Sequence, residues 1–155
     1  MLNERVGEFD RKILALLQAD ARLTNNDLSE KVFLSPSQCS RRRQRLEEEG
    51  LIRGYRAVLD RERLGFALTN MVTVTLATHN RDNARRFAEL VARLPEVQEA
   101  HALTGEMDYI LKVVTPDLRS LSDFVNGELL PHESVQHVKT AIVLETLKET
   151  SALPL

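Results

Sequence analysis

Hydrophobic residues follow two different periods along the chain. In the N-terminal part, apolar residues recur every three or four positions, as Phe9, Ile13 and Leu17 do, which is the spacing of one face of an amphipathic helix over residues 8–19. Later stretches, such as residues 71–77, alternate apolar and polar side chains as half-buried strands do. The pattern predicts a helical N-terminal domain followed by a domain of mixed strands and helices.

A short second helix is expected over residues 25–32. Thr24 is a good N-cap, and Asp27 stands three residues after it as a capping-box partner. Leu28 and Val32, one turn apart, face inward. Residues 33–35 then form a short turn. A third helix should begin directly after this turn.

The third helix has clear start and stop signals. Ser35 is a suitable N-cap, Pro36 occupies the first helical position, and Gln38 completes a capping box. Gly50 supplies the left-handed residue that ends the helix. The helix is unusually rich in arginine, with Arg41, Arg42, Arg43 and Arg45 close together.

Two short helices joined by such a turn are typical of a helix-turn-helix, whose second helix enters the major groove of DNA. Small polar residues and Arg41 are expected at base edges, and the later arginines at phosphates. The alternative is a solvated charged face, balanced by Glu47, Glu48 and Glu49. The residues predicted to bind DNA are Ser35, Ser37, Gln38, Ser40, Arg41, Arg42, Arg45 and Arg53.

The segment after the third helix should complete the DNA-binding domain. Residues 51–60 alternate in polarity and contain Tyr55, which predicts an extended strand, with Arg53 and Arg56 placed to reach phosphates as a wing does. A charged segment then leads to the second domain. The predicted organisation is a winged helix-turn-helix domain over residues 1–60, a linker over 61–69 and a second domain over 70–155.

The second domain shows the order β-α-β-β-α-β, which predicts a ferredoxin-like α+β sandwich with two helices on one face of four strands. The other face should be bare and carry Val, Leu and Ile, which predicts a homodimer formed through this domain. The strands are expected over residues 71–77, 97–103, 107–115 and 135–147, and the helices over residues 83–94 and 116–131.

The net charge does not by itself indicate a nucleic-acid partner. The chain has a formal charge of −2, with 13 Lys and Arg against 11 Asp and Glu in residues 1–64 and 8 against 12 in residues 65–155. The DNA-binding prediction depends on where the arginines cluster. Asp10, beside Arg11 and Lys12, is expected on the solvated surface.

Other residue types argue against several classes of protein. Cys39 is the only cysteine, which excludes an intrachain disulfide, and it is expected to face inward. The histidines lack metal-pair spacing, and phosphate-loop, zinc-protease and nucleophile-elbow motifs are absent, so no enzyme, metal or cofactor is expected. Without a signal peptide or an apolar run of about 18 residues, the expected location is cytoplasmic.

These motifs together resemble the leucine-responsive/asparagine-operon regulator (Lrp/AsnC) family. The resemblance covers essentially the whole chain, and rests on the run from Ser35 to Ile52 and on the run from Thr104 to Lys112. It implies a transcription regulator with an ACT-like C-terminal domain. Such a regulator dimerises, often assembles into octamers, and senses a small molecule, commonly an amino acid.

The resemblance implies an effector site between dimers, at the turn after the second strand and the start of the last strand. Glu106 or Asp108 can accept an ammonium group, and Gly105 can expose backbone amides to a carboxylate. Alternatively, Gly105 only makes a tight turn and Asp108 only pairs with Lys112 or an arginine. Met107 and Val138 suggest an apolar effector such as leucine. The implied effector residues are Thr104, Gly105, Glu106, Met107, Asp108, Gln136, Val138 and Thr140.

Two positions depart from the family pattern. Phe33 stands in the turn where glycine is usual, and Arg43 stands on the inward stripe of the third helix where Val or Ile is usual. Burying an unpaired guanidinium is costly, so the stem of Arg43 is expected to lie along the core while its head reaches an acidic group. The candidates are Asp20, Asp27 and Glu47; a rolled helix is the alternative.

The leading hypothesis is a sequence-specific DNA-binding transcription regulator whose amino-acid effector shifts the association of dimers. One alternative is an architectural DNA-organising protein with no effector. Another is an enzyme similar to the sirohaem decarboxylases, which bind a tetrapyrrole and need a His and Arg cluster that the C-terminal half supplies only thinly. Double-stranded DNA, further copies of the chain and an amino acid are the expected partners, and no membrane.

Overall fold

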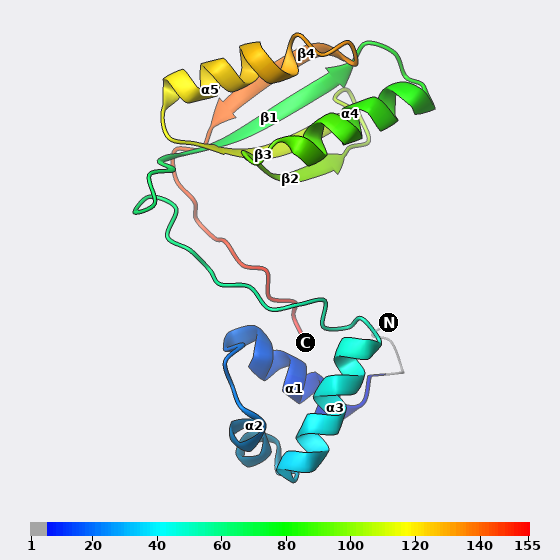
Figure 1. Cartoon of the computed structure of the whole chain (residues 1–155), viewed down its shortest axis with the longest axis vertical. Coiled ribbons are helices and arrows are strands. Elements are labelled where there is room, and N and C mark those ends of the chain that lie inside the picture. The colour runs from blue at the N-terminus through cyan, green and yellow to red at the C-terminus, as the bar shows by residue number, and fades with distance from the viewer. Residues whose placement is uncertain (1–5) are drawn as a thin grey trace. The chain divides into compact units, whose positions relative to one another are not determined.

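The computed structural model describes residues 6–155, which form two compact units (Figure 1). The first unit contains the described residues up to Val58 together with the last segment, Lys148–Leu155, and the second unit is Leu59–Leu147. The last eight residues therefore belong with the helical N-terminal unit, although they follow the second unit along the chain. No helix in residues 6–155 is both long enough and apolar enough to cross a membrane.

The first unit is built from three helices, as predicted. They are α1 (Glu8–Ala19), α2 (Asn25–Val32) and α3 (Pro36–Glu48). Both predicted capping boxes are present, at Thr24 with Asp27 and at Ser35 with Gln38, and Gly50 follows α3 with a φ of 71°. The helices enclose one small core, consisting of Ile13, Leu17, Leu28, Val32, Cys39 and Leu46.

The predicted wing strand over residues 51–60 is absent. This segment has no regular secondary structure in the described chain, and the single backbone bond recorded near its start runs from the Ile52 N–H to the Leu46 carbonyl, at 2.9 Å. Alternating polarity makes a strand only where a neighbouring strand can accept its hydrogen bonds. The four paired strands of the described chain all lie in the second unit.

The second unit contains the predicted sheet of four strands in the order β2-β3-β1-β4. All three neighbouring pairs are antiparallel, and β1 occupies a central position between β3 and β4. The strands are β1 (Leu68–Leu76), β2 (Val97–Ala102), β3 (Tyr109–Thr115) and β4 (Val135–Ile142). The last strand is shorter than predicted, because its ladder with β1 ends at the pair Asn70 and Ile142.

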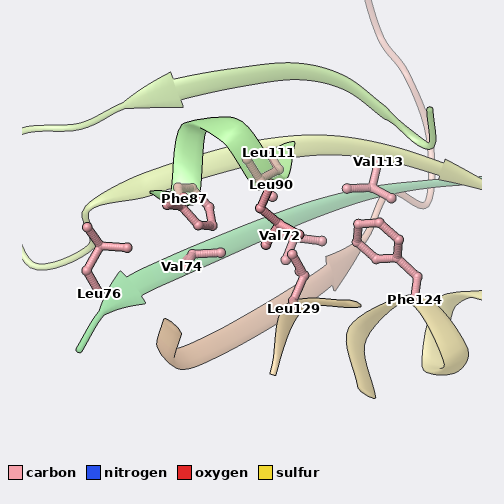
Figure 2. Packing of buried hydrophobic residues seen from close by; sticks show 9 residues of the cluster. All are labelled: Val72, Val74, Leu76, Phe87, Leu90, Leu111, Val113, Phe124 and Leu129. Atoms are coloured by element: carbon pink, nitrogen blue, oxygen red, sulfur yellow. The ribbon is translucent and has the colours of Figure 1, made fainter. Parts of the chain in front are cut away.

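Helices α4 (Arg81–Arg93) and α5 (Leu118–Phe124) cover one face of this sheet (Figure 1). A short π-helix, η1 (Val125–Leu129), continues from α5. Figure 2 shows Phe87 beside Val74 and Phe124 beside Val113, so the two rings enter the core from different helices. Alternation directs Val72, Val74 and Leu76 of β1 into this core, which explains why these alternate positions are apolar.

The opposite face of the sheet is more polar than predicted. The valines and leucines of β1 and β3 point toward the helices, so Val72, Leu111 and Val113 are buried in the core. The residues between them, which lie on the uncovered face, are only half-buried and include Met71, Thr73, Thr75, Ile110 and Lys112. The uncovered face therefore carries Ile110 beside threonines and Lys112, whereas the sequence predicted a face of Val, Leu and Ile.

Candidate nucleic-acid interface and effector-binding loop

The start of α3 presents small polar groups that already have partners within the helix. The Ser35 N–H donates to Gln38 Oε1 at 3.0 Å, and the Gln38 N–H donates to Ser35 Oγ at 3.3 Å. Ser37 Oγ lies 3.1 Å from Ser35 Oγ. The cap uses Ser35 Oγ and Gln38 Oε1, whereas the Gln38 Nε2 amide group keeps its donors for a base. Ser37 and Ser40 are exposed on the same helix.

The predicted arginines form one exposed face, which we call the arginine face: Gln38, Arg41, Arg42 and Arg45. Their spacing places them on one side of the helix, where they line a shallow hollow of about 300 Å³. Arg41 is exposed and has no hydrogen bond or ion pair among the residues that the structure describes. Arg53, also predicted to reach phosphates, is exposed in the irregular segment after α3.

Two residues of the arginine face are attached to a carboxylate on another helix. Arg42 Nη1 donates to Asp10 Oδ1 at 2.8 Å, and Arg45 Nη2 donates to Asp10 Oδ2 at 2.5 Å. The Arg42 guanidinium also lies 5.6 Å from the centre of the Phe9 ring. Asp10 is only 2% exposed, so its predicted place on the solvated surface was wrong. The packing of α3 against α1 buries this carboxylate.

Arg43 lies where the sequence predicted, with its stem inward and its head paired. Its Nε is 3.4 Å from Glu47 Oε1 and 2.9 Å from the Tyr55 hydroxyl, and its Nη1 donates to the Leu23 carbonyl at 3.1 Å. The guanidinium also stacks on the Tyr55 ring, 4.8 Å from its centre. Glu47 was among the expected partners. Tyr55 and the Leu23 carbonyl were not, because neither position is marked by helical spacing.

The predicted effector loop connects β2 to β3 in the second unit. Thr104, Gly105 and Glu106 are exposed, and Gly105 has a φ of 129°, a conformation that side chains rarely adopt. Glu106 has no hydrogen bond or ion pair among the described residues, so its carboxylate is free for a ligand. The loop therefore offers an open glycine backbone and one unused acceptor.

Asp108 has a structural role in this loop. Its Oδ2 accepts a hydrogen bond from the Leu76 N–H at 2.7 Å, and its Oδ1 lies 3.2 Å from His79 Nδ1. Neither residue was predicted to take part in the site, since both belong to the end of β1 and the loop after it. The alternative interpretation paired Asp108 with Lys112 or an arginine; the partners found for Asp108 are Leu76 and His79, and Lys112 Nζ lies 3.5 Å from Glu99 Oε1.

The remaining predicted effector residues do not share one surface. Thr75 Oγ1 lies 3.5 Å from Met107 Sδ, on the uncovered side of the sheet, whereas Val138 packs against the helix-covered core. Gln136 falls at a register shift in β4, where Thr75 pairs with His137 and Leu76 with Val135. Gln136 and Thr140 are exposed. Met107 and Val138, the two apolar residues that suggested a leucine-like effector, therefore lie on different sides of the sheet within one chain.

Comparison with known families identifies both units. Residues 69–153 match the Lrp/AsnC ligand binding domain, and residues 8–53 match a winged helix-turn-helix DNA-binding domain. The chain belongs to the Lrp/AsnC family. It is thus a transcriptional regulator with a DNA-binding unit and a ligand-binding unit, as the sequence predicted.

Full-length relatives support the same assignment. This Lrp/AsnC chain is 37% identical over 148 residues to the transcriptional regulator AzlB of Bacillus subtilis, covering 96% of the chain and 94% of AzlB. It is 41% identical over 141 residues to a leucine-responsive regulatory protein of Rhizobium meliloti, covering 91% and 90%. These relatives are regulators, which leaves the tetrapyrrole-decarboxylase alternative without support.

Solved structures of the family have the same fold. A crystal structure of the transcriptional regulator NMB0573 of Neisseria meningitidis, in a complex with L-Met, has a TM-score of 0.92 and 41% identity and covers 96% of both chains. An AsnC family regulator from Agrobacterium tumefaciens has a TM-score of 0.90 and 37% identity, again with 96% of both chains covered. Among residues 6–155, no group of three or more His, Cys, Asp or Glu side chains could hold a metal ion.

Proposed function

We propose that this Lrp/AsnC regulator places the N-terminal half of α3 in the major groove of double-stranded DNA. The observation that supports the proposal best is the arginine face, because Arg41 is exposed and unpaired among the described residues at one turn from the helix start. Ser37 and Ser40 lie beside it and can contact bases, while Arg42, Arg45 and Arg53 hold phosphates. Gln38 contributes through its side-chain Nε2, which the cap does not use, and Ser35 contributes through its hydroxyl. We propose a cytoplasmic location, which the DNA-binding role supports.

The effector we propose is a small α-amino acid bound at the loop from Thr104 to Asp108. Glu106 accepts the ammonium group, since Asp108 is already engaged by Leu76 and His79. The backbone at Gly105 exposes N–H groups to the carboxylate. The methionine complex of the Neisseria relative supports this ligand class. Gln136 and Thr140, two exposed residues of β4, are further contacts for it.

We further propose that the second unit forms a homodimer and that dimers assemble into a larger particle such as an octamer. Met71 and Ile110 on the uncovered face of the sheet are the apolar side chains available to a second copy. The effector acts by binding one assembly more tightly than another, which changes how many α3 helices meet the DNA together. Light scattering with and without the amino acid measures the mass of the assembled particle directly.

A thermal-shift screen of the twenty amino acids tests the sensor function. A ligand at a hundred times its Kd stabilises the folded protein by about 2.7 kcal/mol, which raises Tm by several degrees. Stabilisation by one or a few amino acids at millimolar concentration is the expected result. A flat response across the set would instead favour an architectural protein that organises DNA without an effector.

A further inference from the structure

Asp10 is a buried carboxylate directly beneath the arginine face. It is 2% exposed, and each of its oxygens accepts from a different arginine of α3, at 2.8 Å from Arg42 and 2.5 Å from Arg45. The two arginine side chains stay 34% and 46% exposed. Because a guanidinium has five N–H donors, each arginine has further donors beside the one held by Asp10, and Arg45 Nε also lies 3.7 Å from Glu49 Oε1.

This arrangement has two opposite effects on DNA binding. The carboxylate cancels part of the positive charge of Arg42 and Arg45, which weakens attraction to any phosphate backbone. It also holds the two guanidinium groups in fixed positions, which favours one docking register over others. Arg41, one position before Arg42, has no such partner among the described residues and keeps its full charge and freedom.

We propose that Asp10 is a positioning residue that sets the DNA specificity of this regulator, by lowering its affinity for arbitrary duplexes while orienting Arg42 and Arg45 for the correct one. The inference rests on the proposed docking of α3 in the major groove. Phe9 supports the same orientation, since its ring stacks on Arg42 at 5.6 Å. Asp10 itself does not contact DNA.

A purely structural role for Asp10 makes a different prediction. If the carboxylate only joined α1 to α3, its loss would lower stability and weaken binding to all duplexes alike. Removing it leaves no buried charge without a counter-ion, since Asp10 is the buried member and both arginines can turn to water. The variant Asp10→Asn therefore separates the two roles by the sign of its effect on arbitrary DNA.

The experiment uses the full chain with Asp10→Asn and a matched control, Glu8→Gln. Glu8 lies on the same helix, and its substitution removes the same charge. Its side chain, however, is 78% exposed and pairs with Lys12 at 2.7 Å. The wild type first selects duplexes from a random pool. Kd is then measured for a selected duplex and for its scrambled version, from about 50 to about 200 mM salt. Melting temperatures identify the range where each variant is folded.

For Asp10→Asn we expect tighter binding to the scrambled duplex, by about threefold to tenfold, and a salt slope steeper by about one unit, as for one more phosphate neutralised. The ratio of the two affinities should fall by about tenfold or more, whereas Glu8→Gln should leave it within about twofold. If Asp10→Asn does not fold, Asp10→Ala makes the same test, because alanine is the residue that most favours a helix.

An unchanged ratio in a folded variant, or weaker binding to both duplexes, overturns the role of Asp10 and leaves the DNA-binding function intact. A wild type that selects no duplex at low salt overturns the docking of α3, and this inference with it. The two failures are distinguished because the wild-type selection is read before any variant is made.

Discussion

Arg43 and Tyr55 contact each other twice: Arg43 Nε donates to the phenol oxygen at 2.9 Å, and the guanidinium lies 4.8 Å from the centre of the ring. The phenol in turn donates to Glu47 Oε1 at 2.7 Å. Through this cluster, α3 is joined to the segment that leaves the DNA-binding unit. An arginine on the inward stripe of the helix is thereby accommodated without an unpaired buried charge.

Replacing Tyr55 with Phe should lower the free energy of unfolding by about 1 kcal/mol, because it removes the hydroxyl shared by Arg43 and Glu47 but keeps the ring. Tyr55→Ala should cost more, since the stacking on Arg43 is lost as well. Urea denaturation measures both variants. Equal losses for the two would mean that the ring contributes nothing.

Alkaline pH should weaken the same cluster. The pKa of Tyr55 is raised, chiefly by burial and next by its hydrogen bond to Glu47. The folded protein thus holds the phenol proton more tightly than the unfolded chain, so this stabilisation is complete below the unfolded pKa of about 10 and is lost as pH rises through the folded value. The stability difference between wild type and Tyr55→Phe should therefore shrink above about pH 10. A constant difference across that range would contradict this assignment.

Phe33 should be an easily improved position. It is the one non-glycine residue with positive φ in the described chain, at 58°, and its side chain is 90% exposed, so it has the cost of a left-handed backbone without the benefit of burial. Phe33→Gly should stabilise the protein by about 0.5 to 1 kcal/mol in thermal denaturation. Phe33→Ala is the control, because it keeps the Cβ atom that causes the strain and should give no comparable gain.

Glu106 should determine effector binding without affecting the fold. Glu106→Gln removes the proposed acceptor of the ammonium group, so the thermal shift produced by the amino acid found in the screen should disappear, while the Tm of the free protein changes little. Glu128→Gln is the matched control, since Glu128 is exposed in the same unit. A full ligand response in Glu106→Gln would transfer the acceptor role to another residue.

The last residues of the chain should depend on Gln18. Its Nε2 donates to the Leu153 carbonyl at 3.1 Å, and its Oε1 accepts from the Leu153 N–H at 2.6 Å, beside a groove of about 710 Å³ that Leu155 also lines. Gln18→Ala should speed hydrogen exchange of the Leu153 amide toward the rate of an unprotected peptide. Gln44→Ala, on the exposed side of α3, should leave that amide protected.

The sequence alone determined the local structure of this protein and its family. Capping boxes at Thr24 and Ser35 and the glycine at position 50 are short-range signals, and they placed the helices of the DNA-binding unit to within a residue or two. Hydrophobic alternation also located the four strands, but less exactly, since β1 begins at Leu68 and β4 ends at Ile142. Such features depend on neighbours within a few positions, which a sequence displays directly.

Tertiary structure decided which polar groups are free. Asp10 lies among charged residues on its helix, yet the packing of α3 buries it under Arg42 and Arg45. The motif suggests that Asp108 binds a ligand, yet its carboxylate accepts a hydrogen bond from Leu76 at the end of β1. The predicted strand over residues 51–60 has no neighbour to pair with. Partners of this kind are distant along the chain, so their availability emerges only when the chain folds.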